Sequence, residues 1–180
     1  IKNAILGMCW NANDPTVGAN AGEAKQWLTQ HASRNANISC LEVQFSERLK
    51  NLMMAVPGGP PIITDGYRGA AAQNAAKATG ASKVGWCGSY HNYGMAADFN
   101  ASNSGTTRWM RVNAARFGLA PVTNGNPVTG CTPRGFCDYG HIQMAGPHPP
   151  SNYCGQCAND VGNGALPPPM NVGQTPSSQF

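Results

Sequence analysis

Few side chains in this 180-residue chain could carry acid–base or metal chemistry. The sequence has four histidines and eight acidic residues, so any such site must be assembled from this small set. His91, Asp98 and His141 stand out among them, because Asp98 and His141 occur in two short segments that also contain small and apolar residues and His91 lies seven positions before Asp98. Two imidazoles and one carboxylate form a ligand set for a zinc ion that keeps its fourth position for water. These three residues therefore predict a catalytic type of zinc site.

Two segments, 95–99 and 141–144, would have to position two of these ligands. Each segment alternates small or polar residues with apolar ones, which is typical of a strand with one buried face. Asp98 lies on the small and polar face of the first segment, and His141 lies on the corresponding face of the second. If the two strands pair, Asp98 and His141 converge.

Loops would supply the other groups of the site. His91 precedes Asp98 by seven positions, and Gly94 between them allows the chain to double back towards the same point. Asp138 lies three residues before His141, where its carboxylate could accept a proton from a water molecule held by the metal and pass it to a leaving amine. Each of these spacings is also common among purely structural residues, so the chemistry depends on all of them meeting.

The remaining pattern predicts an α+β fold with a small, mostly antiparallel sheet and flanking helices. Apolar residues recur at helical spacing in four segments, and short apolar runs suggest three strands. The expected domain spans 1–146, with a helical N-terminal extension over 1–39 and a core over 40–146, followed by a Pro/Gly-rich tail over 147–180 that wraps over the body. The expected helices are 21–36, 41–55, 70–79 and 107–117, the strands are 61–64, 95–99 and 141–144, and 121–136 is a loop.

Composition excludes several classes of function. Charged residues make up 11% of the chain, against about 25% in an ordinary soluble domain. The net charge of +4 is spread out, and no two basic residues are adjacent, so a nucleic-acid partner is not expected. No apolar run is long enough to span a membrane. The mild positive charge suits a partner with an anionic surface, such as a bacterial cell wall.

Seven cysteines are a high count for this length and favour disulfides formed in an oxidising compartment. Their connectivity cannot be read from the sequence, and the odd count leaves one thiol unpaired or paired between chains. Two alternatives stay open, a redox role for the C-G-Q-C segment at 154–157 and a structural zinc site. The cysteines of that zinc site would be Cys131, Cys137, Cys154 and Cys157.

Three ordered blocks of sequence resemble the zinc D-Ala-D-Ala carboxypeptidase (VanY-type) family. They follow the patterns G-[YF]-R-x4-Q at 66–73, S-x-H-x2-G-x-A-x-D at 89–98 and [ED]-x2-H at 138–141. The resemblance is closest to the L-alanyl-D-glutamate endopeptidase branch of phage endolysins and bacterial cell-wall hydrolases. It covers roughly residues 40–145 and leaves out the first 39 residues and the tail.

This resemblance implies a hedgehog/D-Ala-D-Ala-peptidase-like fold and an extracellular or cell-envelope zinc metallopeptidase. The implied substrate is a peptidoglycan stem peptide, cut either between L-Ala and D-Glu or at D-Ala-D-Ala. A non-catalytic cell-wall or virion-associated module that keeps the fold is the alternative, with an assembly partner bound through the N-terminal extension or the tail. The implied roles are zinc ligation by His91, Asp98 and His141, general base catalysis by Asp138, catalysis and substrate binding by Arg68, and substrate binding by Ser89.

Several of these residues also have a simpler structural interpretation. Arg68 could instead form a salt bridge with one of the few acids, and Ser89 could cap a turn. Gln73 is expected to tie its loop to neighbouring backbone. His31 and His148 are expected to pack within a helix and the tail, not to bind a metal. Two departures from the family pattern are Asp138, where many members have Glu, and Gly69, where Ser or Thr is common; a Cys131–Cys137 bridge could stiffen the loop before Asp138.

Overall fold

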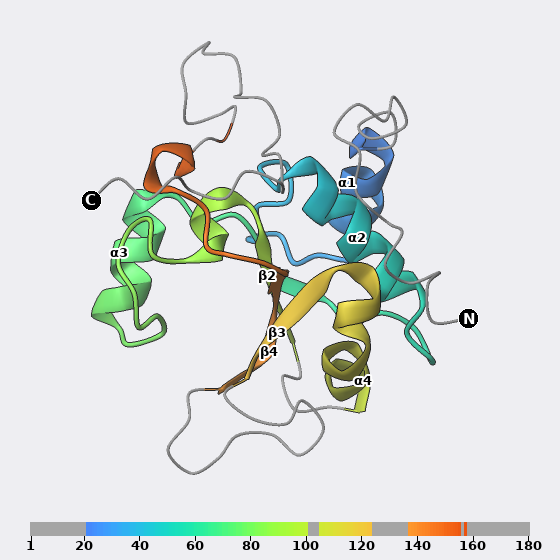
Figure 1. Ribbon diagram of the computed structural model, residues 1–180. Coiled ribbons are helices and arrows are strands. Elements are labelled where there is room, and N and C mark those ends of the chain that lie inside the picture. The colour runs from blue at the N-terminus through green and yellow to red at the C-terminus, as the bar shows by residue number, and fades with distance from the viewer. Residues whose placement is uncertain (1–20, 101–104, 124–136, 156, 158–180) are drawn as a thin grey trace.

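The computed structural model describes residues 21–100, 105–123, 137–155 and 157, which form a mixed helix and sheet structure (Figure 1). The predicted α+β class is confirmed. The described elements are α1 (Ala21–Gln30), α2 (Val43–Met54), β1 (Ile63–Asp65), α3 (Ala70–Ala78), η1 (Tyr90–Tyr93), β2 (Ala96–Phe99), α4 (Gly105–Asn113), η2 (Ala114–Phe117), β3 (Leu119–Thr123), β4 (Cys137–Met144) and η3 (Ser151–Tyr153), where η marks a 3-10 turn.

The sheet has four strands in the order β1-β2-β4-β3, and every neighbouring pair is antiparallel. This order places β2 and β4 in the centre. Their register pairs Ala97 with Ile142, and Asp98 with His141. The alternation predicted from the sequence therefore holds in both central strands, because Ala97 and Ile142 are buried in the core while Asp98 and His141 lie on the other face.

Helices α1, α2 and α4 cover the apolar face of the sheet, and α3 lies on the opposite side of the view in Figure 1. Leu28 of α1 is fully buried and packs in the same core as Phe45 and Leu49 of α2. The segment predicted as an N-terminal extension thus contributes to the core that supports the sheet.

One predicted loop is partly wrong. The sequence predicts irregular structure from residue 121, but β3 continues through Thr123 and pairs with β4. Proline is a weak strand signal because it has no N–H to donate to a ladder, but it is tolerated in an edge strand such as β3. Residues 124–136 of the predicted loop lie outside the described residues.

Two disulfides attach the C-terminal segment to the body, as the cysteine count predicted. Cys154 is bonded to Cys87, and Cys157 is bonded to Cys40. These bonds use both cysteines of the C-G-Q-C segment, so neither the four-cysteine zinc site nor the redox motif is present. Cys131 and the side chain of Cys137 lie outside the described residues, and so does the bridge suggested between them.

None of the helices in the described ranges combines the length and the apolar character needed to cross a membrane.

Candidate metal centre

The three predicted ligands meet on the polar face of the two central strands. Asp98 Oδ1 lies 2.8 Å from His141 Nδ1 and 3.3 Å from His91 Nε2. The two imidazole nitrogens are themselves 3.3 Å apart. One ligand atom from each residue thus falls within a cluster no wider than 4.8 Å, and these three residues form a group that could hold a metal ion.

The distances fit a small tetrahedral ion. Ligand atoms about 2.0–2.1 Å from a tetrahedral zinc ion lie about 3.3 Å from one another. Two of the three separations have this length, and the third is about half an ångström shorter. His91 and His141 are buried, whereas the Asp98 side chain is 25% exposed, so the cluster retains access to solvent. The donor set, two nitrogens and one oxygen, is of the kind that zinc binds.

A short 3-10 turn, η1, positions His91. Ser89 precedes this turn, and its hydroxyl accepts a hydrogen bond from the backbone N–H of His91 at 3.3 Å. Gly94 ends the turn in the left-handed region at φ +67°. A Cβ at Gly94 would collide with the carbonyl oxygen of Cys40, so both the turn and the close packing require glycine. Ser89 therefore acts as a turn cap in this structure.

The two histidines present opposite ring nitrogens to the cluster. His91 directs Nε2 towards Asp98, and its Nδ1 lies 2.6 Å from the carbonyl oxygen of Gly66. His141 directs Nδ1 towards Asp98, and its Nε2 lies 3.1 Å from Gln143 Oε1. Each ring is thus held at the nitrogen that points away from the cluster, an arrangement that commonly orients metal-binding histidines.

Electrostatics couple Asp98 and His141. Burial raises the pKa of Asp98, but hydrogen bonds from His141 and His91 outweigh it and hold that pKa well below its usual range. Burial lowers the pKa of His141, but the hydrogen bond and the charge of Asp98 outweigh it, and the net pKa is raised. In the absence of a cation the cluster therefore favours an ionised Asp98 beside a protonated His141, and a metal ion would replace that proton.

Arg68 holds the second oxygen of Asp98. Its Nη2 lies 3.4 Å from Asp98 Oδ2 and also pairs with Asp65 Oδ2, while Nε donates to the same Asp65 oxygen at 2.9 Å. Nη1 donates to Gln73 at 3.2 Å. Four of the five N–H donors of a guanidinium are thus engaged within the described residues. The salt bridge considered for Arg68 is present, and it turns Asp98 Oδ1 towards the histidines.

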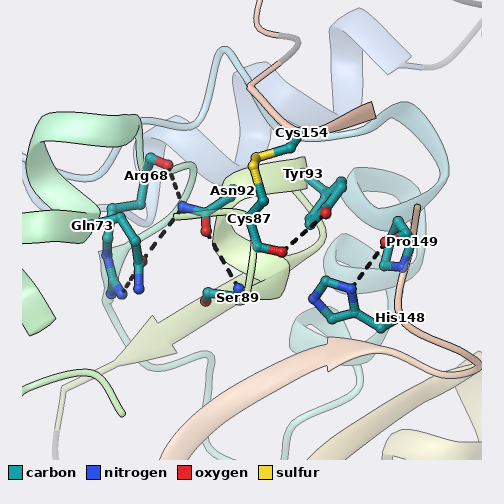
Figure 2. Close-up of a disulfide and its surroundings, with 9 residues drawn as sticks. All are labelled: Arg68, Gln73, Cys87, Ser89, Asn92, Tyr93, His148, Pro149 and Cys154. Carbon is teal, nitrogen blue, oxygen red and sulfur yellow. Dashed lines mark hydrogen bonds between the residues drawn. A yellow bond between two sulfur atoms is a disulfide. The ribbon is translucent and has the colours of Figure 1, made fainter. Parts of the chain in front are cut away.

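A buried amide pair connects Arg68 to the His91 turn (Figure 2). Asn92 donates from Nδ2 to the carbonyl oxygen of Arg68 at 2.8 Å and lies 3.4 Å from Gln73 Oε1. Gln73 is fully buried and donates to the carbonyl oxygen of Val84 at 2.8 Å, which is the loop-tying role expected for it. Asn92 was not singled out by the sequence, because an amide inside a turn carries no distinctive signal.

Asp138 lies in β4 at an irregular point of the sheet. In a regular strand, residues three positions apart face opposite sides, so Asp138 and His141 would diverge. Here Pro121 and Val122 of β3 pair with Ile142 and Asp138, so three residues of β4 are bypassed and the alternation is broken. Asp138 is half-buried, and its charge contributes to the raised pKa of His141. Its carboxylate therefore acts on the cluster without belonging to it.

The other two histidines have packing roles. The ring of His31 stacks on Trp27 with centroids 3.9 Å apart, and its Nδ1 lies 2.9 Å from the Trp27 carbonyl oxygen. His148 is exposed and makes edge contacts with Tyr90 and Tyr93, while its Nδ1 lies 2.9 Å from the carbonyl oxygen of Pro149 (Figure 2). Neither residue belongs to the group that could hold a metal.

Comparison with known proteins does not assign this chain to a family. No known family model matches the chain, and no curated protein sequence matches it.

Proposed function

We propose that this chain is a zinc metallopeptidase that hydrolyses peptidoglycan stem peptides, with a fold of the hedgehog/D-Ala-D-Ala-peptidase type. The observation that carries the proposal is the meeting of His91 Nε2, Asp98 Oδ1 and His141 Nδ1 at separations suited to one tetrahedral ion. The order and spacing of the three sequence blocks that resemble VanY-type peptidases support the choice of substrate. The two disulfides support action outside the cytoplasm, at the cell envelope.

His91, Asp98 and His141 would hold the ion, and the solvent-accessible side of Asp98 leaves room for water. When bound, zinc supplies Lewis acidity, which makes water a better nucleophile near neutral pH and polarises a carbonyl group. Asp138 is the proposed proton acceptor, because it is half-buried, its charge acts on His141, and its carboxylate is anchored by the backbone N–H of Gly140 at 3.3 Å. It would take a proton from the attacking water and give it to the leaving amine.

Arg68 is proposed to act mainly by orienting Asp98, because most of its donors are already engaged. The donor that remains could contact a substrate carboxylate or the oxygen on which negative charge develops. Ser89 is placed to act through the His91 turn that it caps, and a direct contact between its hydroxyl and substrate remains part of the proposal.

The decisive test is mass analysis of the products released from defined muropeptides by the oxidised, zinc-loaded protein. Cleavage between L-Ala and D-Glu, or release of terminal D-Ala, is expected, and chelation should abolish it until zinc is restored. Asp138→Asn should lower the rate by about 10²- to 10⁴-fold through loss of the proton acceptor while zinc remains bound. Glu23→Gln, which removes an exposed carboxylate from α1, is the matched control and should leave the rate unchanged.

Two results would count against the proposal. Hydrolysis that survives both chelation and Asp138→Asn would show that the chemistry lies elsewhere. Zinc binding with no hydrolysis of any wall fragment would instead favour the non-catalytic module.

A further inference from the structure

We propose that Gln143 is a positioning residue for the metal centre, which fixes the tautomer of His141 and thereby sets how tightly the site binds zinc. This inference rests on the metal site of the proposed function but not on its peptidase activity. It starts from the hydrogen bond between His141 Nε2 and Gln143 Oε1, which is 3.1 Å long.

The hydrogen bond selects one ring nitrogen for the metal. A neutral imidazole carries one proton, and the nitrogen without it is the one that can bind a cation. Because His141 directs Nδ1 into the cluster, Nε2 must carry the proton, and that proton needs an acceptor. The amide oxygen of Gln143 provides this acceptor. With Nε2 held in this way, Nδ1 remains bare for the metal.

The sheet explains why Gln143 can reach His141. The two residues are two positions apart in β4, so their side chains share a face. Gln143 pairs with Ala96 of β2 on one side and with Ala120 of β3 on the other. Both neighbours are alanines, which leave space on the face of the sheet for the longer amide side chain to lie along the strand towards His141.

The same task at His91 is carried out by the backbone. His91 Nδ1 lies 2.6 Å from the carbonyl oxygen of Gly66, an acceptor that no side-chain substitution at that position removes. At His141 the acceptor is a half-buried side chain, which can be replaced without changing the backbone. The two histidines therefore differ in the kind of acceptor that holds them. Of the two acceptors, only the Gln143 side chain can be removed by a substitution.

The test compares two substitutions of similar size. Gln143→Met removes the acceptor and should weaken zinc binding by about 10- to 100-fold, the usual effect of losing a group that orients a metal-binding histidine. Gln143→Glu keeps an acceptor oxygen and should retain an affinity close to that of the unmodified protein. Affinity is measured by competition with a chromophoric chelator, and circular dichroism with thermal melting confirms that each variant is folded.

A second measurement needs no variant. In the unmodified protein loaded with zinc, ¹⁵N spectra should show His141 with a protonated, slowly exchanging Nε2 and a metal-bound Nδ1. Equal weakening by Gln143→Met and Gln143→Glu, unchanged affinity in Gln143→Met, zinc on Nε2, or no zinc binding at all would each overturn the inference. Zinc binding with the expected pattern but no peptide hydrolysis would support it while the proposed function failed.

Discussion

At the scale of single residues, a metal ion entering the candidate centre would compete with a proton on His141. In the metal-free protein His141 has a raised pKa because Asp98 stabilises its charged form against the effect of burial. Asp98 stays ionised to low pH because its own pKa is held well below the usual range. Of this coupled pair, His141 is therefore the member that must lose a proton before the metal can bind.

This coupling predicts how zinc affinity depends on pH. As the pH falls through the raised pKa of His141, its protonated form competes with zinc, so affinity should begin to fall above the ordinary histidine value of 6.5. Below that point the fall should approach about tenfold for each pH unit per histidine protonated. Chelator competition from about pH 8 to pH 5 measures it. Affinity as tight at pH 5 as at pH 8 would exclude a site built on two histidines.

At the scale of elements, the short turn η1 determines the position of His91. Gly94, which caps the C-terminal end of η1, has φ +67° and packs against the backbone at Cys40 and Glu42. The backbone N–H of Glu42 also donates to the carbonyl oxygen of Gly94 at 2.9 Å. The turn is therefore fastened to the start of α2, and the packing leaves no room for a side chain at this position.

We predict that Gly94→Ala is more damaging than the same change at Gly80. Gly80 also has a left-handed backbone, at φ +78°, but no atom lies within 4 Å of the point that a Cβ there would occupy. Gly80→Ala should cost only the conformational penalty of about 1–2 kcal/mol in the free energy of unfolding. Gly94→Ala should cost more and should also weaken zinc binding, because the Cys40 backbone must move. Denaturant unfolding and zinc competition measure both effects, and equal costs with unchanged zinc binding would contradict the prediction.

Sequence patterns predicted β2 and the second half of β4, but they missed the first half of β4, where Asp138 lies in the strand and not in the expected loop. The alternation in 95–99 and 141–144 depends only on which residues can be buried, so the sequence alone was enough to place Asp98 and His141 on one face. The strand β3 (Leu119–Thr123) was not predicted, because Pro121 suppresses the usual strand signal. The bypassed residues of β4 depend on how two distant segments pair, and local sequence does not encode that register.

The supporting contacts of the site were harder to predict than its ligands. Arg68 was assigned to substrate by resemblance, but its contacts with Asp65 and Asp98 depend on side chains brought together by tertiary packing. Gln143 shares a strand face with His141 because the two are two positions apart, yet nothing in the sequence indicated that its amide would reach the imidazole. Candidate metal ligands can be recognised from their residue types, whereas the residues that hydrogen-bond to them are brought together only by the tertiary fold.

At the scale of the whole molecule, two disulfides attach the C-terminal segment next to η1, the turn that carries His91. Cys154 is bonded to Cys87, close before Ser89, and the backbone N–H of Gly155 donates to the carbonyl oxygen of Asn92 at 2.9 Å. Cys157 is bonded to Cys40, whose carbonyl oxygen lies against Gly94. The two bonds therefore secure both sides of η1, across sequence separations of 67 and 117 residues.

Removing either bond should destabilise the protein and loosen the centre. The paired substitutions Cys87→Ser with Cys154→Ser, and Cys40→Ser with Cys157→Ser, should each lower the free energy of unfolding by about 2–4 kcal/mol. Zinc affinity should fall in both variants, because each bond supports a segment that contacts η1. Melting temperature and zinc competition, with and without reductant, test this. Unchanged zinc affinity in a folded variant would show that the bonds stabilise the chain without shaping the site.

The position of these cysteines also imposes an order of events on the maturation of the chain. Cys154 and Cys157 come after every proposed metal ligand, so the turn around His91 receives its final support only when residue 157 has been synthesised. Both bonds further require an environment that oxidises thiols. A nascent chain, or one held in a reducing compartment, carries all three ligands but lacks the two crosslinks that steady them. We therefore expect zinc loading of the proposed site to be a late event, which depends on oxidative folding and not only on the presence of the three ligands.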